Sequence, residues 1–352
     1  MTPAPALAPH HQRRATALTL IVGAACLVLF AYTLRSVGLA EIADRVRSLG
    51  IGGFVGIMAL SGARMAVRAL AWMRCVEGGH RLGFADAFTA TIMGEALGNL
   101  TPLANFLSEP SKAVFVRNRV PLPVALPAIV VENIIYTVSV ALMIGVGAVT
   151  FLLAFTVPEF LRAASIGALV GMAVVVVAGY LVLRAHVRPF SGTIAWLHAR
   201  GLRLRWLQAR MDRVLRFENG VTSFTSRNGR HLAPLALYEA AFHMAGVAEV
   251  YLTLALVDPG GVTLLAALVV ESTGRVINVL FKFVPMRFGV DEAGNVLLAR
   301  PLALMPASLV TLALVRKARI LAWTAVGVAL IFRRGLTVRR ALREAGGATA
   351  SA

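Results

Sequence analysis

Polar and charged residues gather in two stretches of otherwise hydrophobic sequence, at residues 94–124 and 275–306. Each unpaired charge at the centre of a bilayer costs about 2.5–3.5 kcal/mol, so these groups need pairing or a wet cavity. A wet cavity with both signs of charge suits a zwitterionic or phosphate-bearing group, with the phosphate on Arg or Lys and an amine on a carboxylate. The candidate substrate-binding residues are Glu95, Asn99, Asn105, Glu109 and Lys112 in the first stretch and Arg275, Asn278, Lys282, Arg287, Asp291, Glu292 and Asn295 in the second. In the alternative, the same charges only neutralise one another and hold these segments in place.

The two stretches share a spaced signature. Identical residues recur 183 positions apart, pairing Pro102 with Pro285, Glu109 with Glu292, Arg117 with Arg300, and Pro123 with Pro306. Paired hydrophobic segments that Pro or Gly interrupts, at corresponding positions of two halves, indicate a transport site near the membrane midplane. We interpret the matches as an internal repeat; coincidence among residues common in membrane proteins is the alternative.

The composition is that of a membrane protein. The chain has 352 residues, of which 58% are hydrophobic, in runs far longer than a soluble core helix needs. Its net charge is +18, but the basic residues lie between the hydrophobic runs and lack interleaved aromatic residues. We therefore expect membrane lipids as partners and no nucleic acid. The two cysteines, Cys26 and Cys75, form no metal or redox spacing.

Six hydrophobic runs predict membrane-crossing helices and an all-α, polytopic fold. They are residues 16–34, 50–73, 124–153, 163–183, 233–256 and 304–332. Residues 85–119 are expected to break at Pro102 and Pro110, and residues 264–300 at Pro285 and Gly289. Each of these two segments then forms helices too short to cross about 30 Å of hydrocarbon, which predicts a re-entrant hairpin. Treating each hairpin as one crossing gives the alternative of eight spans.

The repeat divides the chain into two membrane units with tails. Residues 1–15 are predicted to be a disordered N-terminal tail, 16–161 the first membrane repeat, 162–332 the second, and 333–352 a basic C-terminal tail. The second repeat contains a polar insert, residues 184–230, with ten arginines. Apolar residues recur there at three- and four-residue steps, as in an amphipathic helix that lies on the membrane surface.

The basic residues also predict the orientation in a cell membrane. With six crossings, 22 of the 35 Lys and Arg residues share the side of both termini, and five lie on the other side. The positive-inside rule then makes the N- and C-termini cytoplasmic, whereas eight spans would place the arginine-rich insert outside. Three crossings per half invert the second repeat relative to the first. The two hairpins would then enter from opposite sides and meet near the midplane, as alternating access requires.

Charged residues inside the predicted spans form a second tier of candidates. Arg64 and Arg68 are expected to pair with Glu132, Glu249 with Arg316 and Arg319, and Asn133 and Tyr136 to lie beside the hairpins, corresponding by the repeat to Arg316 and Arg319. Ion pairing within a helix bundle is their favoured role. Glu239 and His243 lie one helical turn apart, where they could relay protons or share an ordinary hydrogen bond.

Motifs of common enzymes are missing from the sequence. It has no glycine-rich phosphate loop with Lys-Ser/Thr, no His-Glu-x-x-His, no Gly-x-Ser-x-Gly and no cysteine cluster. We therefore predict no enzymatic activity, no metal and no cofactor.

The segments GEALGNLTPLANFLSEPSKAVFVRNR, VVENIIYTVSVAL and FVPMRFGVDEAGN resemble the flippase-like integral membrane family that includes the transmembrane flippase domain of lysylphosphatidylglycerol synthases. The family's recurring pattern corresponds here to Gly94, Glu95, Asn99, Pro102, Glu109, Pro110, Pro285, Gly289 and Glu292. The resemblance covers nearly the whole chain and implies lipid translocation between leaflets. Leu107-Ser108 replaces the family's frequent glycine pair, and no aminoacyl-transfer domain is present. The resemblance therefore does not imply an aminoacylated substrate.

The sequence thus predicts a flippase for a lipid with a polar headgroup. Glu109 and Glu292 would be symmetric partners at the centre of a wet groove. Two alternatives remain open: a membrane anchor that holds a lipid-synthesising enzyme through its arginine-rich insert, and an intramembrane headgroup transferase.

Overall fold

The computed structural model describes residues 28–76, 79–100, 104–184, 192–193, 200, 215, 229–258, 260–281 and 284–334. All regular structure in these residues is helical, which confirms the predicted all-α class. Both tails, the start of the first predicted span and most of the arginine-rich insert lie outside the described residues, and so does the amphipathic helix predicted there.

Before the arginine-rich insert, the described chain contains a short helix, Val28–Val37, followed by five longer helices. These are α2 (Leu39–Cys75), α3 (Phe84–Asn99), α4 (Ala104–Phe115), α5 (Leu122–Ala154) and α6 (Glu159–Arg184). The bend in α2 lies at Gly50, whose φ of 63° and ψ of 174° are open to glycine but costly for other residues. The polar residues before the predicted span therefore continue into it as one bent helix.

The elements after the insert repeat the order of α2 to α5. They are α10 (Gly229–Val257), α11 (Leu264–Leu280), the 3₁₀ turn η1 (Pro285–Arg287), α12 (Val290–Val296) and α13 (Pro306–Arg333). The predicted spans at 124–153, 163–183, 233–256 and 304–332 each coincide with one helix. Helix breaks also lie where Pro285 and Gly289 predicted them, and α3 ends at Asn99 and α4 begins at Ala104, on either side of Pro102, which lies outside the described residues.

The break predicted at Pro110 is wrong, because Pro110 lies inside α4. A proline within a helix removes one backbone hydrogen bond and costs about 3 kcal/mol. The turn that follows Pro110 buries Ser111, Lys112 and Ala113 against neighbouring helices, and this packing offsets the cost.

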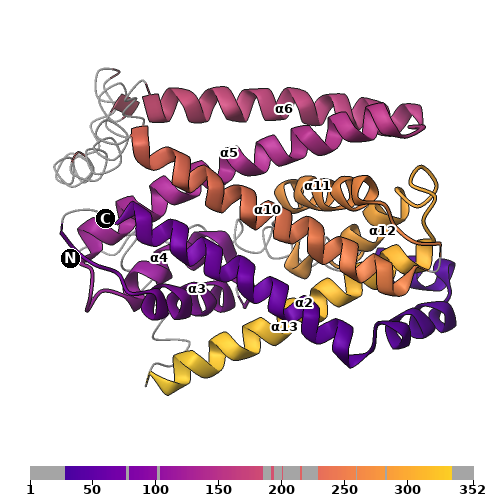
Figure 1. Ribbon diagram of the computed structural model, residues 1–352, viewed down its shortest axis with the longest axis horizontal. Helices are drawn as coiled ribbons and strands as arrows, with labels where there is room; N and C mark the ends of the chain where they lie inside the picture. The colour runs from indigo at the N-terminus through magenta and orange to yellow at the C-terminus, as the bar shows by residue number, and fades with distance from the viewer. Residues whose placement is uncertain are drawn as a thin grey trace.

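The packing of the two halves follows a two-fold pattern. When α2, α3, α4 and α5 are exchanged with α10, α11, α12 and α13, every principal helix contact among these eight maps onto another principal contact. Thus α3 packs on α13 as α11 packs on α5, and α2 packs directly on α10. Figure 1 shows α2 and α10 running in opposite directions, with α3 and α4 toward one end of the molecule and α11 and α12 toward the other.

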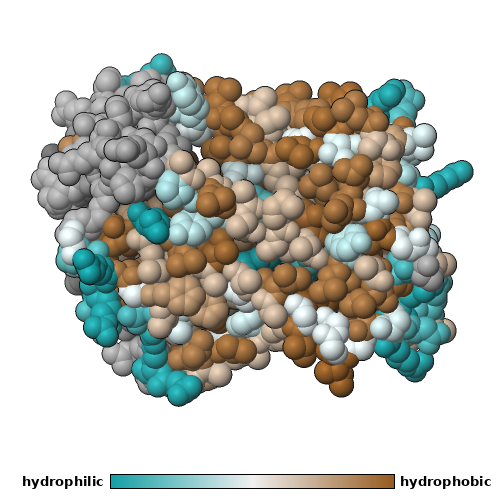
Figure 2. All heavy atoms as spheres, viewed as in Figure 1, coloured by the Kyte–Doolittle hydropathy of each residue, from teal (hydrophilic) through white to brown (hydrophobic). Residues whose placement is uncertain are grey.

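The surface is apolar around its middle. Figure 2 shows a hydrophobic belt between two ends where hydrophilic residues gather. Among the described residues, α2, α5, α10 and residues 159–181 of α6 are long and apolar enough to cross a membrane. The middle of α13 carries Arg316, Lys317 and Arg319, so α13 is long enough but more polar. These observations define a multi-pass membrane protein.

Close contact between α3 and α13 depends on Gly327. A Cβ atom at this position would lie 2.5 Å from the Cβ of Ala96 and 2.7 Å from the carbonyl oxygen of Ile92. We expect Gly327→Ala to separate the two helices and to destabilise the protein by about 1–3 kcal/mol. The thermal midpoint in detergent measures this loss. The matched control is Gly171→Ala on α6, where nothing lies within 4 Å; an equal loss in both variants would contradict the prediction.

Candidate functional site

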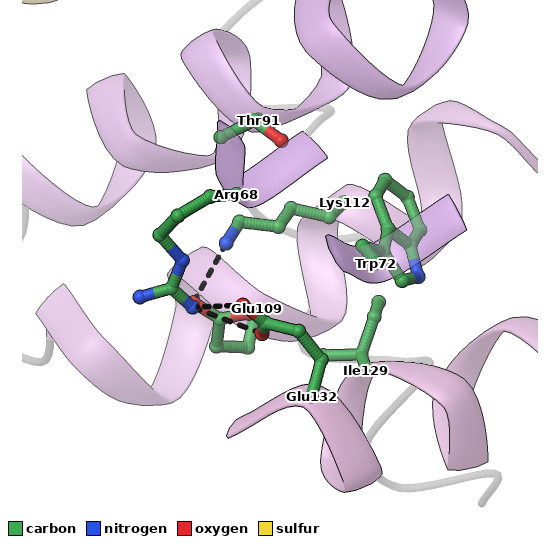
Figure 3. A pocket seen from close by; sticks show the side chains of 7 residues that line it. All are labelled: Arg68, Trp72, Thr91, Glu109, Lys112, Ile129 and Glu132. Atoms are coloured by element: carbon green, nitrogen blue, oxygen red, sulfur yellow. Dashed lines mark hydrogen bonds and ion pairs between the residues drawn. The ribbon is translucent and has the colours of Figure 1, made fainter. Parts of the chain in front are cut away.

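A charged pocket lies where α2, α3, α4 and α5 meet. Its lining residues are Arg68, Trp72, Thr91, Glu109, Lys112, Ile129 and Glu132. Figure 3 shows the two cationic and two carboxylate side chains pointing toward one another, with the Trp72 ring and Ile129 beside them. The space between them admits no water molecule in this conformation. A ligand must therefore take the place of existing ion pairs.

Two ion pairs set the geometry of this pocket. Lys112 Nζ lies 2.8 Å from Glu109 Oε1, one helical turn away on α4, and Asn133 Nδ2 on α5 donates to Glu109 Oε2 at 2.9 Å. Arg68 on α2 lies 2.9 Å from the Glu132 carboxylate on α5. The Arg68 guanidinium also stacks 3.9 Å from the centre of the Tyr136 ring. These contacts thus tie α2 to α5 and α5 to α4.

A second charged cluster joins the break between α11 and α12 to α13. Glu292 is fully buried; its Oε1 lies 2.6 Å from Lys317 Nζ, and its Oε2 accepts a hydrogen bond from the Gly289 backbone N–H at 2.8 Å. Arg287 donates to Asp291 at 3.1 Å and to Asn278 Oδ1 at 2.9 Å. Gly289 has a φ of 79°, which lets the chain turn directly into α12. In this cluster every carboxylate contacts a cation.

A third cluster lies between α2, α10, α11 and α13. We call it the arginine cluster, and its residues are Arg64, Glu249, Glu271, Arg275, Arg316 and Arg319. Glu271 contacts Arg316 at 2.5 Å, Arg275 at 2.6 Å and Arg64 at 3.7 Å, and Glu249 contacts Arg319 at 2.5 Å and Arg64 at 3.0 Å. The Tyr136 hydroxyl, 3.4 Å from Arg275 Nη1, joins the arginine cluster to the pocket. The polar groups therefore extend continuously from the pocket to α13.

Two of the pairings predicted for the second tier are present and two are wrong. Arg68 pairs with Glu132 and Arg319 with Glu249, as predicted. Arg64, however, contacts Glu249 and Glu271 rather than Glu132, because it lies one helical turn from Arg68, nearer to α10 and α11. Arg316 contacts Glu271 rather than Glu249.

The structure does not bring all predicted substrate residues together. Glu109 and Glu292, expected to share one centre, are held in separate clusters by separate partners. Asn99 is exposed and donates to Thr324 Oγ1 at 3.0 Å, and buried Asn295 donates to the Leu309 carbonyl. Glu95 is half-buried and forms no ion pair with any described residue. The side chain of Asn105 and all of Lys282 lie outside the described residues.

Two central residues were missed by the sequence reasoning. Glu271 contacts three arginines, and Lys317 holds Glu292. Glu271 could have been found from its position four residues before Arg275, which places both on one helix face. Asn133 contacts Glu109 in the first half, and Lys317 contacts Glu292 in the second. By these contacts Lys317, rather than Arg316, is the counterpart of Asn133.

The expected pair on α10 is bridged by a serine from α5. Ser139 Oγ donates to Glu239 Oε2 at 2.9 Å and lies 3.0 Å from His243 Nε2. Both partners are buried. Serine, histidine and glutamate do not form a hydrolase triad here, because Glu239 contacts the serine and not the other imidazole nitrogen. Among the described residues, no group of His, Cys, Asp or Glu side chains could hold a metal ion.

The apolar belt, the long helices and the buried charges define an all-helical membrane protein with a polar interior. The chain belongs to the family described as the lysylphosphatidylglycerol synthase TM region, whose model matches residues 16–331. This membership confirms the resemblance found in the sequence and indicates a function related to membrane lipids. No curated protein and no solved structure matches the chain.

Proposed function

We propose that the protein moves a lipid with a polar headgroup from one membrane leaflet to the other. The headgroup would enter the charged pocket while the acyl chains stay in the lipid beside it. The observation that carries this proposal is the pocket itself, in which Arg68 and Lys112 face Glu109 and Glu132 below the surface of an apolar bundle.

The closed state of the pocket fits a substrate that exchanges with ion pairs. Without substrate, each charge has a partner in the protein, so none is left unpaired in a poorly solvated site. A headgroup phosphate can replace a carboxylate as partner of Arg68 or Lys112. A headgroup amine, if there is one, can replace a cation beside Glu109. A zwitterionic or phosphate-bearing headgroup would thus enter with few uncompensated charges.

We further propose that the chain crosses the membrane six times and forms two re-entrant hairpins, with both termini in the cytoplasm. The two-fold contact pattern and the opposite directions of α2 and α10 support an inverted repeat. The breaks after α3 and α11 support hairpins that enter from opposite ends. Labelling of single cysteines at Arg81 and at Arg300 tests this topology: reagents applied outside intact cells should reach position 300 and not position 81.

Reconstitution into liposomes tests the transport. The lipid carries a label on its acyl chain, and a quencher that cannot cross the membrane is added outside. We expect labelled lipid from the inner leaflet to become accessible to the quencher faster in vesicles that contain the protein than in empty vesicles. Phosphatidylethanolamine, phosphatidylcholine and phosphatidylglycerol probes should be compared, because the pocket has both signs of charge. Arg68→Gln removes the guanidinium from the pocket and should slow the fastest probe by about tenfold or more. Rates equal to those of empty vesicles for every probe would refute the proposal.

A further inference from the structure

The arginine cluster carries more positive than negative charge. Four arginines, Arg64, Arg275, Arg316 and Arg319, surround only two carboxylates, Glu249 and Glu271, which leaves an excess of two positive charges. The adjacent pair of Arg68 and Glu132 is balanced, as are the pairs of Lys112 with Glu109 and of Arg287 and Lys317 with Asp291 and Glu292. Glu239, bonded to Ser139, would lower the excess to one if it is ionised. Among the described charge clusters, the excess of positive charge therefore lies in the arginine cluster.

The four guanidinium groups are largely buried, and most of their donors have no acceptor among the described residues. Their side chains are between 10% and 18% exposed. Each guanidinium has five N–H donors, yet the described residues supply only five hydrogen bonds to the four groups together. The Nε atoms of Arg64 and Arg319 are buried without a hydrogen-bond partner among the described residues. Unsatisfied cationic donors in a membrane interior favour an anionic ligand.

Two glycines provide the space that this cluster occupies. A Cβ atom on Gly246 of α10 would lie 2.6 Å from Glu271 Oε1, and one on Gly274 of α11 would lie 2.8 Å from Arg316 Nη1. Larger residues at either position would displace these charged groups. Phe242 covers one side of the cluster, with Arg64 and Arg275 lying 4.6 Å and 5.2 Å from its ring centre. The walls are therefore shaped around the guanidinium groups.

From these observations we propose that the arginine cluster is a second binding site, selective for a net-anionic, phosphate-bearing headgroup. This inference rests on the proposed transport function and adds the charge of its substrate. A phosphate would be held by the planar guanidinium groups, which match its oxygens in pairs. It would also neutralise the excess charge. Tyr136, which contacts both Arg68 and Arg275, places this second site directly beside the pocket.

Ligand-dependent thermal stability of the purified full-length protein in dodecyl maltoside tests the proposal. A ligand that binds only the folded state raises the thermal midpoint as its concentration exceeds its Kd. Short-chain phosphatidylglycerol should raise the midpoint, and short-chain phosphatidylcholine should raise it much less. Inorganic phosphate is the third probe: a rise with the lipid alone identifies a lipid headgroup, and a rise with both identifies an anion site that also accepts free phosphate. No rise with phosphatidylglycerol, or an equal rise with phosphatidylcholine, would overturn the proposal.

Arg316→Gln gives the sharper arm of this experiment. Arg316 is the most exposed of the four arginines. When its guanidinium is removed, Glu271 keeps Arg275 and Arg64 as partners. We expect the variant to be at least as stable as the parent without ligand, because the excess charge falls. Its affinity for phosphatidylglycerol should fall about tenfold or more. A purely structural Arg316 would show the opposite pattern: lower stability without ligand and an unchanged response to it.

Arg47→Gln on the exposed part of α2 is the matched control. Arg47 is 79% exposed and pairs only with Asp44 among the described residues, so neither stability nor ligand response should change. The two proposals can fail separately. If the protein moves lipid in liposomes but phosphatidylglycerol does not raise its thermal midpoint, the anionic site alone is refuted. If phosphatidylglycerol raises the midpoint of the parent but not of Arg316→Gln, and the parent moves no lipid, transport alone is refuted.

Discussion

Lys317→Met is expected to destabilise the protein by about 3–5 kcal/mol, the cost of leaving a buried carboxylate without its partner. Glu292 is fully buried, and Lys317 Nζ is the one cationic group within 4 Å of it in the described structure. Its remaining contact is the Gly289 backbone N–H. Methionine fills the volume of the lysine but cannot compensate the charge. A lower thermal midpoint in detergent and aggregation during size-exclusion chromatography measure the effect.

The double variant Glu292→Gln/Lys317→Met separates charge from packing. Glutamine can still accept the Gly289 N–H bond, and no buried charge is left. Most of the lost stability should therefore return. Lys112→Met provides a matched comparison in the first half, where the Glu109 side chain is 27% exposed and also receives a hydrogen bond from Asn133. Its loss should be clearly smaller. Equal losses at positions 112 and 317 would show that burial does not decide the cost.

The order of the elements could be predicted from the sequence because prolines and glycines act locally. Pro102 and the pair of Pro285 and Gly289 interrupt hydrophobic runs; one helix ends before Pro102 and the next begins after it, and the structure breaks at Pro285 and Gly289. Pro110 obeys the same local rule and was predicted to break its helix. Burial of the turn that follows it keeps α4 intact, and burial of a short segment depends on helices that are distant in sequence.

The candidate site was harder to predict, because its pairings are set between helices. The repeat pointed to Glu109 and Glu292, and each of them pairs with a buried lysine. It could not show that α4 supplies a lysine to Glu109, whereas α13 supplies one to Glu292. Glu271 lies outside the repeated signature, in a hydrophobic run. Arg275 lies one turn away on the same helix, but the other two arginines that contact Glu271 come from α2 and α13, and only the folded structure brings them to it.

The two repeated glutamates, Glu109 and Glu292, are therefore not equivalent, and the difference in their effects on transport and stability can be measured. Glu109→Gln should cost less stability than Glu292→Gln, because the glutamine oxygen can still accept hydrogen bonds from Lys112 and Asn133, and the carboxylate of Glu132 remains in the same pocket as Lys112. It should slow lipid movement about 10- to 100-fold, the range that one charge-assisted hydrogen bond provides. Glu292→Gln should instead lower stability, because it leaves Lys317 with Asp291 alone, at 3.4 Å.

Liposome transport and the thermal midpoint, measured on the same preparations, test this contrast. Asp44→Asn is the matched control for both, since Asp44 is 71% exposed and belongs to neither cluster. Stable Glu109→Gln protein that moves lipid at the parental rate would remove Glu109 from the transport mechanism. Stable Glu292→Gln protein with slowed transport would restore the symmetric centre that the sequence predicts. We therefore expect the roles to divide by exposure, with Glu109, whose side chain is 27% exposed, acting in transport and Glu292, whose side chain is 0% exposed, acting in folding.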